Sequence, residues 1–176
     1  MTEADKNGFR KDIITAFMME AKNKIKIRNG LDQHLFPEVV KNSMGLIQTF
    51  TAFESFANGK FPVNNATDGI KHFCKEYEDY MEEIYPSLES FIEKIYNEIQ
   101  KSSLKNMANQ NTDGLEINGK KNFEEIFNVM YRVRSNIVHG NKAIDNNRNT
   151  LLIENSFKLL YTIFEQVLKN KEYISF

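Results

Sequence analysis

The sequence predicts an all-α protein, a helical bundle of about five to six helices. Apolar residues recur every three or four positions in several long segments, which is the spacing of one buried helix face. Asn, Gly and Pro gather between those segments, and these residues end helices. A chain of 176 residues fits one domain, so we expect residues 1–176 to form a single bundle.

Local signals set the expected helix boundaries. Pro37 suits the first turn of a helix, and Tyr85-Pro86 is expected to break one, because proline disfavours helical backbone at the residue before it. We therefore expect two separate helices on either side of Pro86, packed as an antiparallel pair. The expected helices cover residues 8–28, 38–58, 70–84, 87–101, 122–139 and 150–170.

The segment 102–121 is expected to be the least regular part of the chain. It is rich in Asn and Gly, and Leu115-Glu116-Ile117 is its one candidate for a short strand. A loop of about twenty residues is unusual in a compact domain and is often functional or mobile.

Composition narrows the class of protein further. Fourteen Phe and no Trp predict a core rich in phenylalanine, and a net charge of −1 means that any RNA contact needs a local basic patch. Cys74 is the only cysteine, which excludes an internal disulfide and favours a reducing compartment. The acidic N-terminus and the short apolar run Ile13 to Met19 predict no signal peptide and no membrane span. We expect a cytoplasmic protein.

The stretch Tyr131 to Gly140, with the sequence YRVRSNIVHG, combines two arginines, an amide and a histidine. Arginine can fork onto phosphate oxygens, and histidine can move a proton near neutral pH. A structural interpretation competes with this one. Asn122 and Glu125 resemble a capping box, Gly140 suits a C-terminal cap, and His139 would complement the helix dipole.

The longer string favours a functional interpretation. Arg134-x-x-x-x-His139, preceded by Tyr131-Arg132-Val133, resembles the signature of the HEPN superfamily of small α-helical domains. Many HEPN domains are metal-independent RNases of toxin–antitoxin and phage-defence systems, and the resemblance implies that Arg134 and His139 are the catalytic pair. One departure concerns Ser135, because many family members carry Asn directly after the motif arginine.

Other residues are candidates for supporting roles. Arg132, Asn136 and Lys142 are candidates for binding the phosphate or the base of the substrate. Glu54 lies among three phenylalanines, where a carboxylate either needs a partner or faces solvent. Some HEPN branches place an acidic residue of an early helix near the motif, which makes Glu54 a candidate site residue. From residue 132 to residue 148 the sequence carries four positive charges and one negative charge, which predicts a local basic patch.

Metal, cofactor and nucleotide motifs are not evident. His34, His72 and His139 are scattered, and the sequence has neither a phosphate-binding loop nor a nucleophile elbow. We therefore expect a metal-independent endoribonuclease without a cofactor, in which the 2′-hydroxyl of the RNA substrate attacks its own phosphate.

The expected assembly is a homodimer. On a helix Arg134 and His139 project about 140° apart, and each motif supplies one histidine, whereas acid–base cleavage is fastest with two titrating groups. A two-fold dimer would bring two copies of His139 to one cleft. A separate antitoxin or nucleotidyltransferase is a further partner that the resemblance implies. The alternative interpretation is a non-catalytic helical module that binds RNA, a nucleotide or a partner protein.

Overall fold

The computed structural model describes residues 13–22, 38–106, 114–139 and 146–170. Within these ranges the chain is an all-helical bundle, as the sequence predicts. A short helix covers residues 13–22. The labelled helices are α2 (Glu38–Lys60), α3 (Ala66–Glu76), α4 (Glu78–Lys101), α5 (Phe123–Val138) and α6 (Asn147–Asn170).

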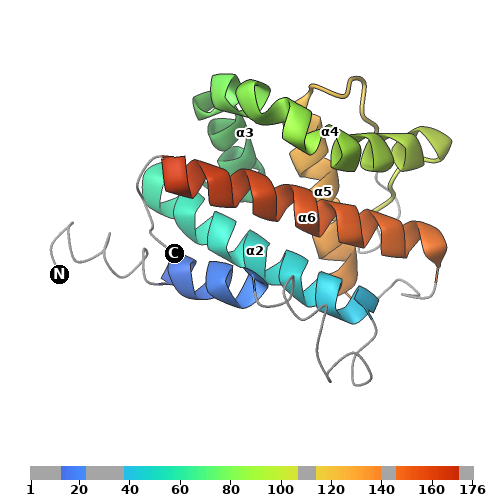
Figure 1. Ribbon diagram of the computed structural model, residues 1–176, viewed down its shortest axis with the longest axis horizontal. Coiled ribbons are helices and arrows are strands. Elements are labelled where there is room, and N and C mark those ends of the chain that lie inside the picture. Colours follow the sequence, from blue (N-terminus) through green and yellow to red (C-terminus); the bar gives the residue numbers. More distant parts are fainter. Residues whose placement is uncertain (1–12, 23–37, 107–113, 140–145, 171–176) are drawn as a thin grey trace, which may run out of the picture.

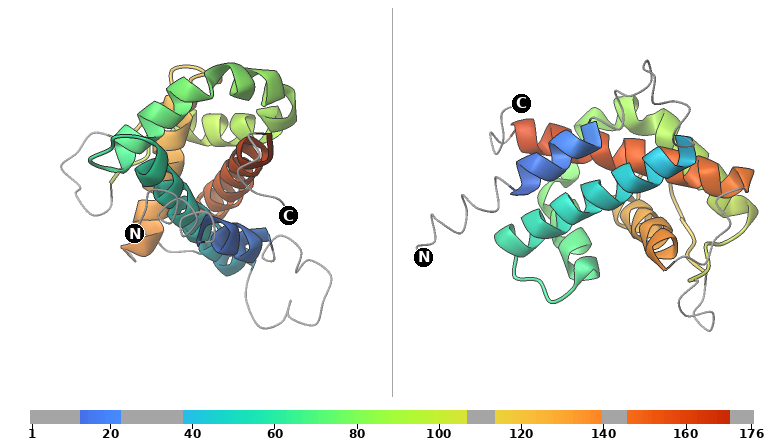
Figure 2. Two further views of the ribbon diagram at one scale, coloured as in Figure 1. Left: turned by 90° about the vertical axis from the view of Figure 1, so that its left-hand side faces the viewer. Right: turned by 90° about the horizontal axis from the view of Figure 1, so that it is seen from below.

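Helix α6 lies at the centre of the bundle. It runs between α2 on one side and α4 on the other, and α5 crosses behind it (Figure 1). Helices α2 and α6 run in the same direction, because Gly45 lies against Phe157 and Phe53 lies against Phe164. The helix at 13–22 packs beside α2 and α6 (Figure 2), with Lys22 Nζ 4.0 Å from a carboxylate oxygen of Glu165.

The core is rich in phenylalanine, as the composition predicts. Phe53 makes ring contacts at 5.1–5.8 Å with Phe73, Phe127 and Phe164, which come from α3, α5 and α6. The contacts with Phe73 and Phe164 are edge-to-face, a geometry that is favourable beyond simple area burial. One residue of α2 thus holds three other helices in register, and the residue that follows it is the candidate site residue Glu54.

Helices α2 and α6 approach closely at a glycine. A Cβ atom placed on Gly45 would lie 2.3 Å from Cζ of Phe157, which is far inside van der Waals contact. The absence of a side chain at residue 45 therefore leaves the space that the Phe157 ring fills.

The expected break at Pro86 is wrong. Helix α4 runs unbroken from Glu78 to Lys101 with Pro86 inside it, and the chain turns at Tyr77 instead. The antiparallel pair of helices 70–84 and 87–101 therefore does not exist. Met81, Leu88, Ile92, Ile95 and Ile99 form one buried stripe that keeps its register through the proline. Packing along that stripe outweighs the local cost of about 3 kcal/mol that a helical proline carries.

Two other expectations need correction. In the first helix helical spacing predicts a buried stripe of Phe9, Ile13, Phe17 and Ala21. The buried positions are instead Ile14, Met18 and Ala21, whereas Ile13 and Phe17 are only partly buried. The residues expected to extend that helix, 8–12 and 23–28, lie outside the described part of the chain. In the loop, Leu104 and Leu115 form a single antiparallel bridge in place of a strand at 115–117.

Candidate functional site

Helix α5 carries the motif, and its ends follow from capping chemistry. The side chain of Asn122 accepts a hydrogen bond from the backbone N–H of Glu125 at 3.2 Å, which confirms the N-terminal cap. The Glu125 carboxylate does not return to Asn122. It accepts hydrogen bonds from the backbone and the side chain of Asn118 at 2.7 and 2.8 Å. This contact ties the loop before α5 to the first turn of the helix.

Two aromatic contacts fix the position of α5 on α2. The ring of Phe127 lies 5.8 Å from that of Phe53, and the ring of Tyr131 lies 5.8 Å from that of Phe50. Both partners are buried residues of α2. The part of α5 that begins at Tyr131 is therefore held against the part of α2 that carries Glu54.

Arg134 and Glu54 meet across this junction. Arg134 Nη2 lies 3.5 Å from Glu54 Oε2, and the two side chains keep 21% and 28% of their surface exposed. The ion pair can therefore be reached from solvent. Arg134 Nε is buried and has no hydrogen-bond acceptor among the described residues, which therefore satisfy only part of the guanidinium. The placement agrees with the expectation that an acidic residue of an early helix lies beside the motif arginine.

Arg132 occupies a different environment. Successive helical residues advance by about 100°, so Arg132 and Arg134 project from nearly opposite sides of α5. Arg132 Nη1 is buried and has no acceptor among the described residues, and burial lowers the pKa of the Arg132 guanidinium. An unsatisfied charged donor in this position is costly for the fold.

Asn136 lies in the interior. Its side chain is 2% exposed, and its Nδ2 donates a hydrogen bond to the backbone oxygen of Lys105 at 3.1 Å. The residue thus anchors the start of the irregular segment onto α5. The sequence makes Asn136 a candidate for binding the phosphate or the base of the substrate, but this contact gives it a structural function in the chain.

His139 lies at the exposed end of α5. It is the residue after the last helical one, and its backbone N–H donates to the oxygen of Ser135 at 3.0 Å. Its imidazole is solvent-exposed. Gly140 and Lys142, the expected cap and the third binding candidate, lie outside the described residues. The structure thus brings Glu54 to Arg134, while His139 stands further along the same helix.

The predicted basic patch is partly neutralised inside the chain. Arg148 lies at the start of α6, where Nη2 donates to the backbone oxygens of Glu98 and Ser102. Its Nε lies 3.8 Å from Glu98 Oε2. These contacts join α6 to the end of α4, so Arg148 has a structural function, and Arg134 already faces Glu54. Lys142 and Asp145 complete the patch in sequence but lie outside the described part.

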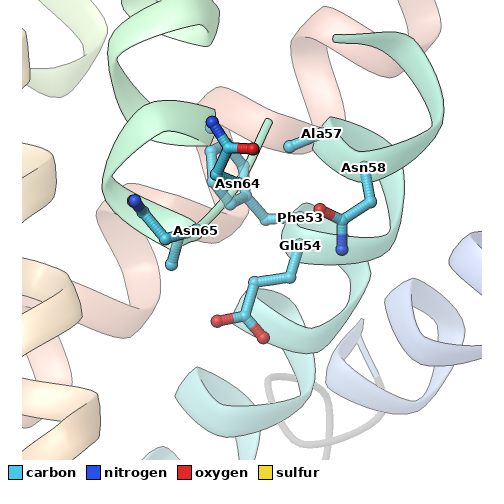
Figure 3. Close-up of a pocket in the computed structure, with 8 residues that line it drawn as sticks. Phe53, Glu54, Ala57, Asn58, Asn64 and Asn65 are labelled. Carbon is cyan, nitrogen blue, oxygen red and sulfur yellow. The ribbon is translucent and has the colours of Figure 1, made fainter. Parts of the chain in front are cut away.

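Glu54 also lines a pocket. It measures about 200 Å³ and lies between the second half of α2 and the start of α3, where Asn58, Asn64 and Asn65 line it (Figure 3). None of the motifs that predicted the site candidates lies in the segment between these helices. Its one signal in the sequence is the group of asparagines next to a helix start, and such amides are common there for capping alone.

Comparisons of the chain with models of protein families, with curated proteins and with solved structures found no match. Among the described residues, no group of three or more His, Cys, Asp and Glu side chains is placed to hold a metal ion. No helix in the described ranges is both long enough and apolar enough to cross a bilayer.

Proposed function

We propose that this chain is a HEPN-type, metal-independent endoribonuclease that cleaves RNA by 2′-hydroxyl transesterification. The observation that carries the proposal is the contact between Arg134 and Glu54 at 3.5 Å. An arginine beside a carboxylate, reachable from solvent, together with an exposed histidine five residues further along the chain, offers a cation and proton-transfer groups. We further propose that it acts in the cytoplasm as a toxin or an anti-phage effector, as the family resemblance implies.

The roles of the residues follow from the chemistry of the phosphodiester. The 2′-hydroxyl attacks the adjacent phosphorus, the P–O bond to the 5′-oxygen breaks, and the products carry a 2′,3′-cyclic phosphate and a 5′-hydroxyl. Arg134 stabilises the negative charge that grows on the phosphate oxygens, and His139 moves a proton. Each role is typically worth about two to four powers of ten in rate.

Glu54 holds the guanidinium of Arg134 in place through the ion pair at Nη2. This leaves the other Nη atom of Arg134 for a phosphate oxygen. A two-fold homodimer supplies a second His139, so that one imidazole acts as base and the other as acid. The proposed partners are therefore an RNA substrate and a second copy of the chain, with a separate antitoxin or nucleotidyltransferase as regulator.

Cleavage of labelled RNA in excess EDTA tests the proposal. The parental protein should cut RNA and leave 2′,3′-cyclic phosphate ends, whereas Arg134→Ala and His139→Ala should each abolish cutting with an unchanged helical circular dichroism spectrum. Lys94→Ala and His72→Ala are matched controls, because both side chains are exposed on other helices. Loss of activity in EDTA, 3′-hydroxyl products, or parental rates in either motif variant would contradict the proposal.

A non-catalytic binding module is the second candidate function. The observation that favours it is that Arg134 and His139 project about 140° apart on α5, so that one chain does not bring the proposed catalytic pair together. Retarded migration of uncut RNA on a gel, abolished by Arg134→Ala and indifferent to His139→Ala, would support this candidate over the nuclease.

A further inference from the structure

The pocket is lined by three amides and three small residues, together with Phe53 and Glu54. Asn58 lies in the last turn of α2, and Asn64 and Asn65 precede α3, on the opposite side of the pocket (Figure 3). The small residues are Ala57, Ala66 and Gly69. A Cβ atom on Gly69 would lie 3.1 Å from Cβ of Ala57, so α2 and α3 already pack closely beneath the hollow. The small side chains create a depth that larger ones would fill.

Two of the amides are available to a ligand. Asn65 caps α3, since its side-chain oxygen accepts a hydrogen bond from the backbone N–H of Asp68 at 2.9 Å. The side-chain amides of Asn58 and Asn64 have no hydrogen-bond partner among the described residues, and both are solvent-exposed. Each amide presents a donor and an acceptor together.

The charges around the pocket select against an anion. Glu54 lines one edge (Figure 3), and the Asp68 carboxylate accepts a hydrogen bond from the backbone N–H of Asn64 at 3.3 Å. Two carboxylates near the opening repel a phosphate and attract N–H donors. The Asn65 cap already satisfies the Asp68 N–H in the first turn of α3, which removes one donor that an anion would use.

The size of the pocket suits one planar ring system. Sites for drug-sized ligands usually measure about 300–1,000 Å³, whereas this pocket measures about 200 Å³. Amide side chains recognise nucleobases through paired donors and acceptors, as asparagine does with the amino group and ring nitrogen of adenine. Recognition of unpaired bases along such edges is how proteins read single-stranded RNA.

We propose that this pocket binds a nucleobase that carries an exocyclic amino group, from the RNA strand whose phosphate contacts Arg134. The inference rests on the proposed function for the identity of the strand. Glu54 connects the two sites, because it lines the pocket and also contacts Arg134 at 3.5 Å. Asn58 and Asn64 pair with the edge of the base, and the Glu54 carboxylate accepts from its exocyclic amino group. Adenine, cytosine and guanine are therefore accepted over uracil, which has no exocyclic amino group.

Binding of single nucleotides tests the pocket without any cleavage. Titration of the full chain with AMP, CMP, GMP and UMP, followed by calorimetry or amide chemical shifts, should give the weakest binding for UMP. Ribose 5-phosphate serves as the ligand without a base. Asn58→Ala combined with Asn64→Ala should raise the Kd of the preferred nucleotide about tenfold or more, because two hydrogen bonds are lost. Ala66→Leu should do the same by filling the hollow, and Asn97→Ala, an exposed asparagine on α4, is the matched control.

The outcomes separate the pocket from the nuclease. Base-selective binding that both pocket variants lose, in a protein that does not cut RNA, supports the pocket and contradicts the proposed nuclease. Cleavage that is indifferent to the base beside the cut, together with equal Kd values for all four nucleotides, contradicts the pocket and leaves the nuclease in place. Binding of ribose 5-phosphate as tight as that of the nucleotides would show an anion site and overturn the inference.

Discussion

Glu54 Oε2 lies 3.5 Å from Arg134 Nη2, so a carboxylate of α2 and the motif arginine of α5 are neighbours although eighty residues separate them in the chain. Both side chains are partly exposed, and ion pairs of this kind contribute about 0–1 kcal/mol to stability. Because the ion pair adds so little to stability, we expect its main effect to be the orientation of the Arg134 guanidinium.

The first prediction follows from that orientation. Glu54→Gln should lower the rate of RNA cleavage about 10- to 100-fold and change the free energy of unfolding by less than about 1 kcal/mol. If Glu54 acts through Arg134, Glu54→Gln should lower the cleavage rate only slightly further in a protein that already carries Arg134→Lys, because the effects of coupled residues are not additive. Glu82→Gln, an exposed acidic residue of α4, is the control. Full additivity of the two losses would show that Glu54 acts independently of Arg134.

The second prediction concerns the closest approach of α2 and α6. Gly45→Ala should destabilise the fold by about 1–3 kcal/mol, because the new methyl group would overlap the Phe157 ring, 2.3 Å away at Cζ. Alanine in a helix otherwise favours folding over glycine by about 1 kcal/mol. Chemical denaturation measures the loss. Phe157→Leu should restore part of it in the double variant, and a Gly45→Ala protein as stable as the parent would contradict the packing.

The third prediction separates a structural function of Asn136 from a function in substrate binding. Asn136→Ala should lower the free energy of unfolding by about 1–3 kcal/mol, because the backbone oxygen of Lys105 loses its donor in a buried setting. Asn97→Ala should leave stability unchanged. If Asn136→Ala keeps parental stability and yet loses RNA binding, the side chain contacts substrate after all.

The fourth prediction uses the buried thiol of Cys74. Burial raises the pKa of this thiol, with smaller contributions from Glu124 and Glu78, so the folded chain holds its proton at a pH where the unfolded chain releases it. The unfolded thiol titrates near about pH 8.5. The stability that the neutral thiol contributes is therefore complete below that pH and falls above it, by about 1.4 kcal/mol per pH unit. Cys74→Ala should show a shallower loss of unfolding free energy between about pH 9 and 10, and an identical slope would contradict the burial.

The parts of the fold that follow from local periodicity were predictable, and those that depend on distant contacts were not. The N-terminal cap at Asn122 is encoded within a few residues, and it appears as expected. The break expected at Pro86 follows from a local rule. The helix continues through the proline because a stripe of buried residues along all of α4 holds it together.

The same distinction holds at the candidate site. The inward position of Asn136 depends on the backbone of Lys105, thirty-one residues earlier. A helical wheel of α5 cannot show this contact, because Lys105 is not part of the helix. The structural function of Arg148 depends on the end of α4 in the same way. Glu54 could be named as a candidate because a carboxylate among phenylalanines is conspicuous, but its contact with Arg134 needs the tertiary fold.

The fifth prediction concerns the assembly of the site. Arg134 is held by Glu54 on the α2 side of α5, whereas His139 stands exposed at the helix end, and about 140° of helical rotation separates the two. We therefore expect each active site to combine Arg134 of one protomer with His139 of its partner. Mixed dimers of Arg134→Ala and His139→Ala chains, prepared with two different affinity tags, should then regain one pair of Arg134 and His139 and cleave RNA faster than either homodimer. Their rate should stay below half of the parental rate, because only one of the two imidazoles is present.

Two measurements decide against the shared site. If each protomer needs its own Arg134 and His139, the mixed dimer remains as inactive as the two homodimers, and dimers of parental and doubly substituted chains keep about half of the rate. If light scattering gives a monomer that cleaves RNA at full rate, no second imidazole is present to protonate the leaving oxygen. Glu54 would then be the nearest group to Arg134 able to exchange a proton, and Glu54→Gln would abolish cleavage instead of lowering it 10- to 100-fold.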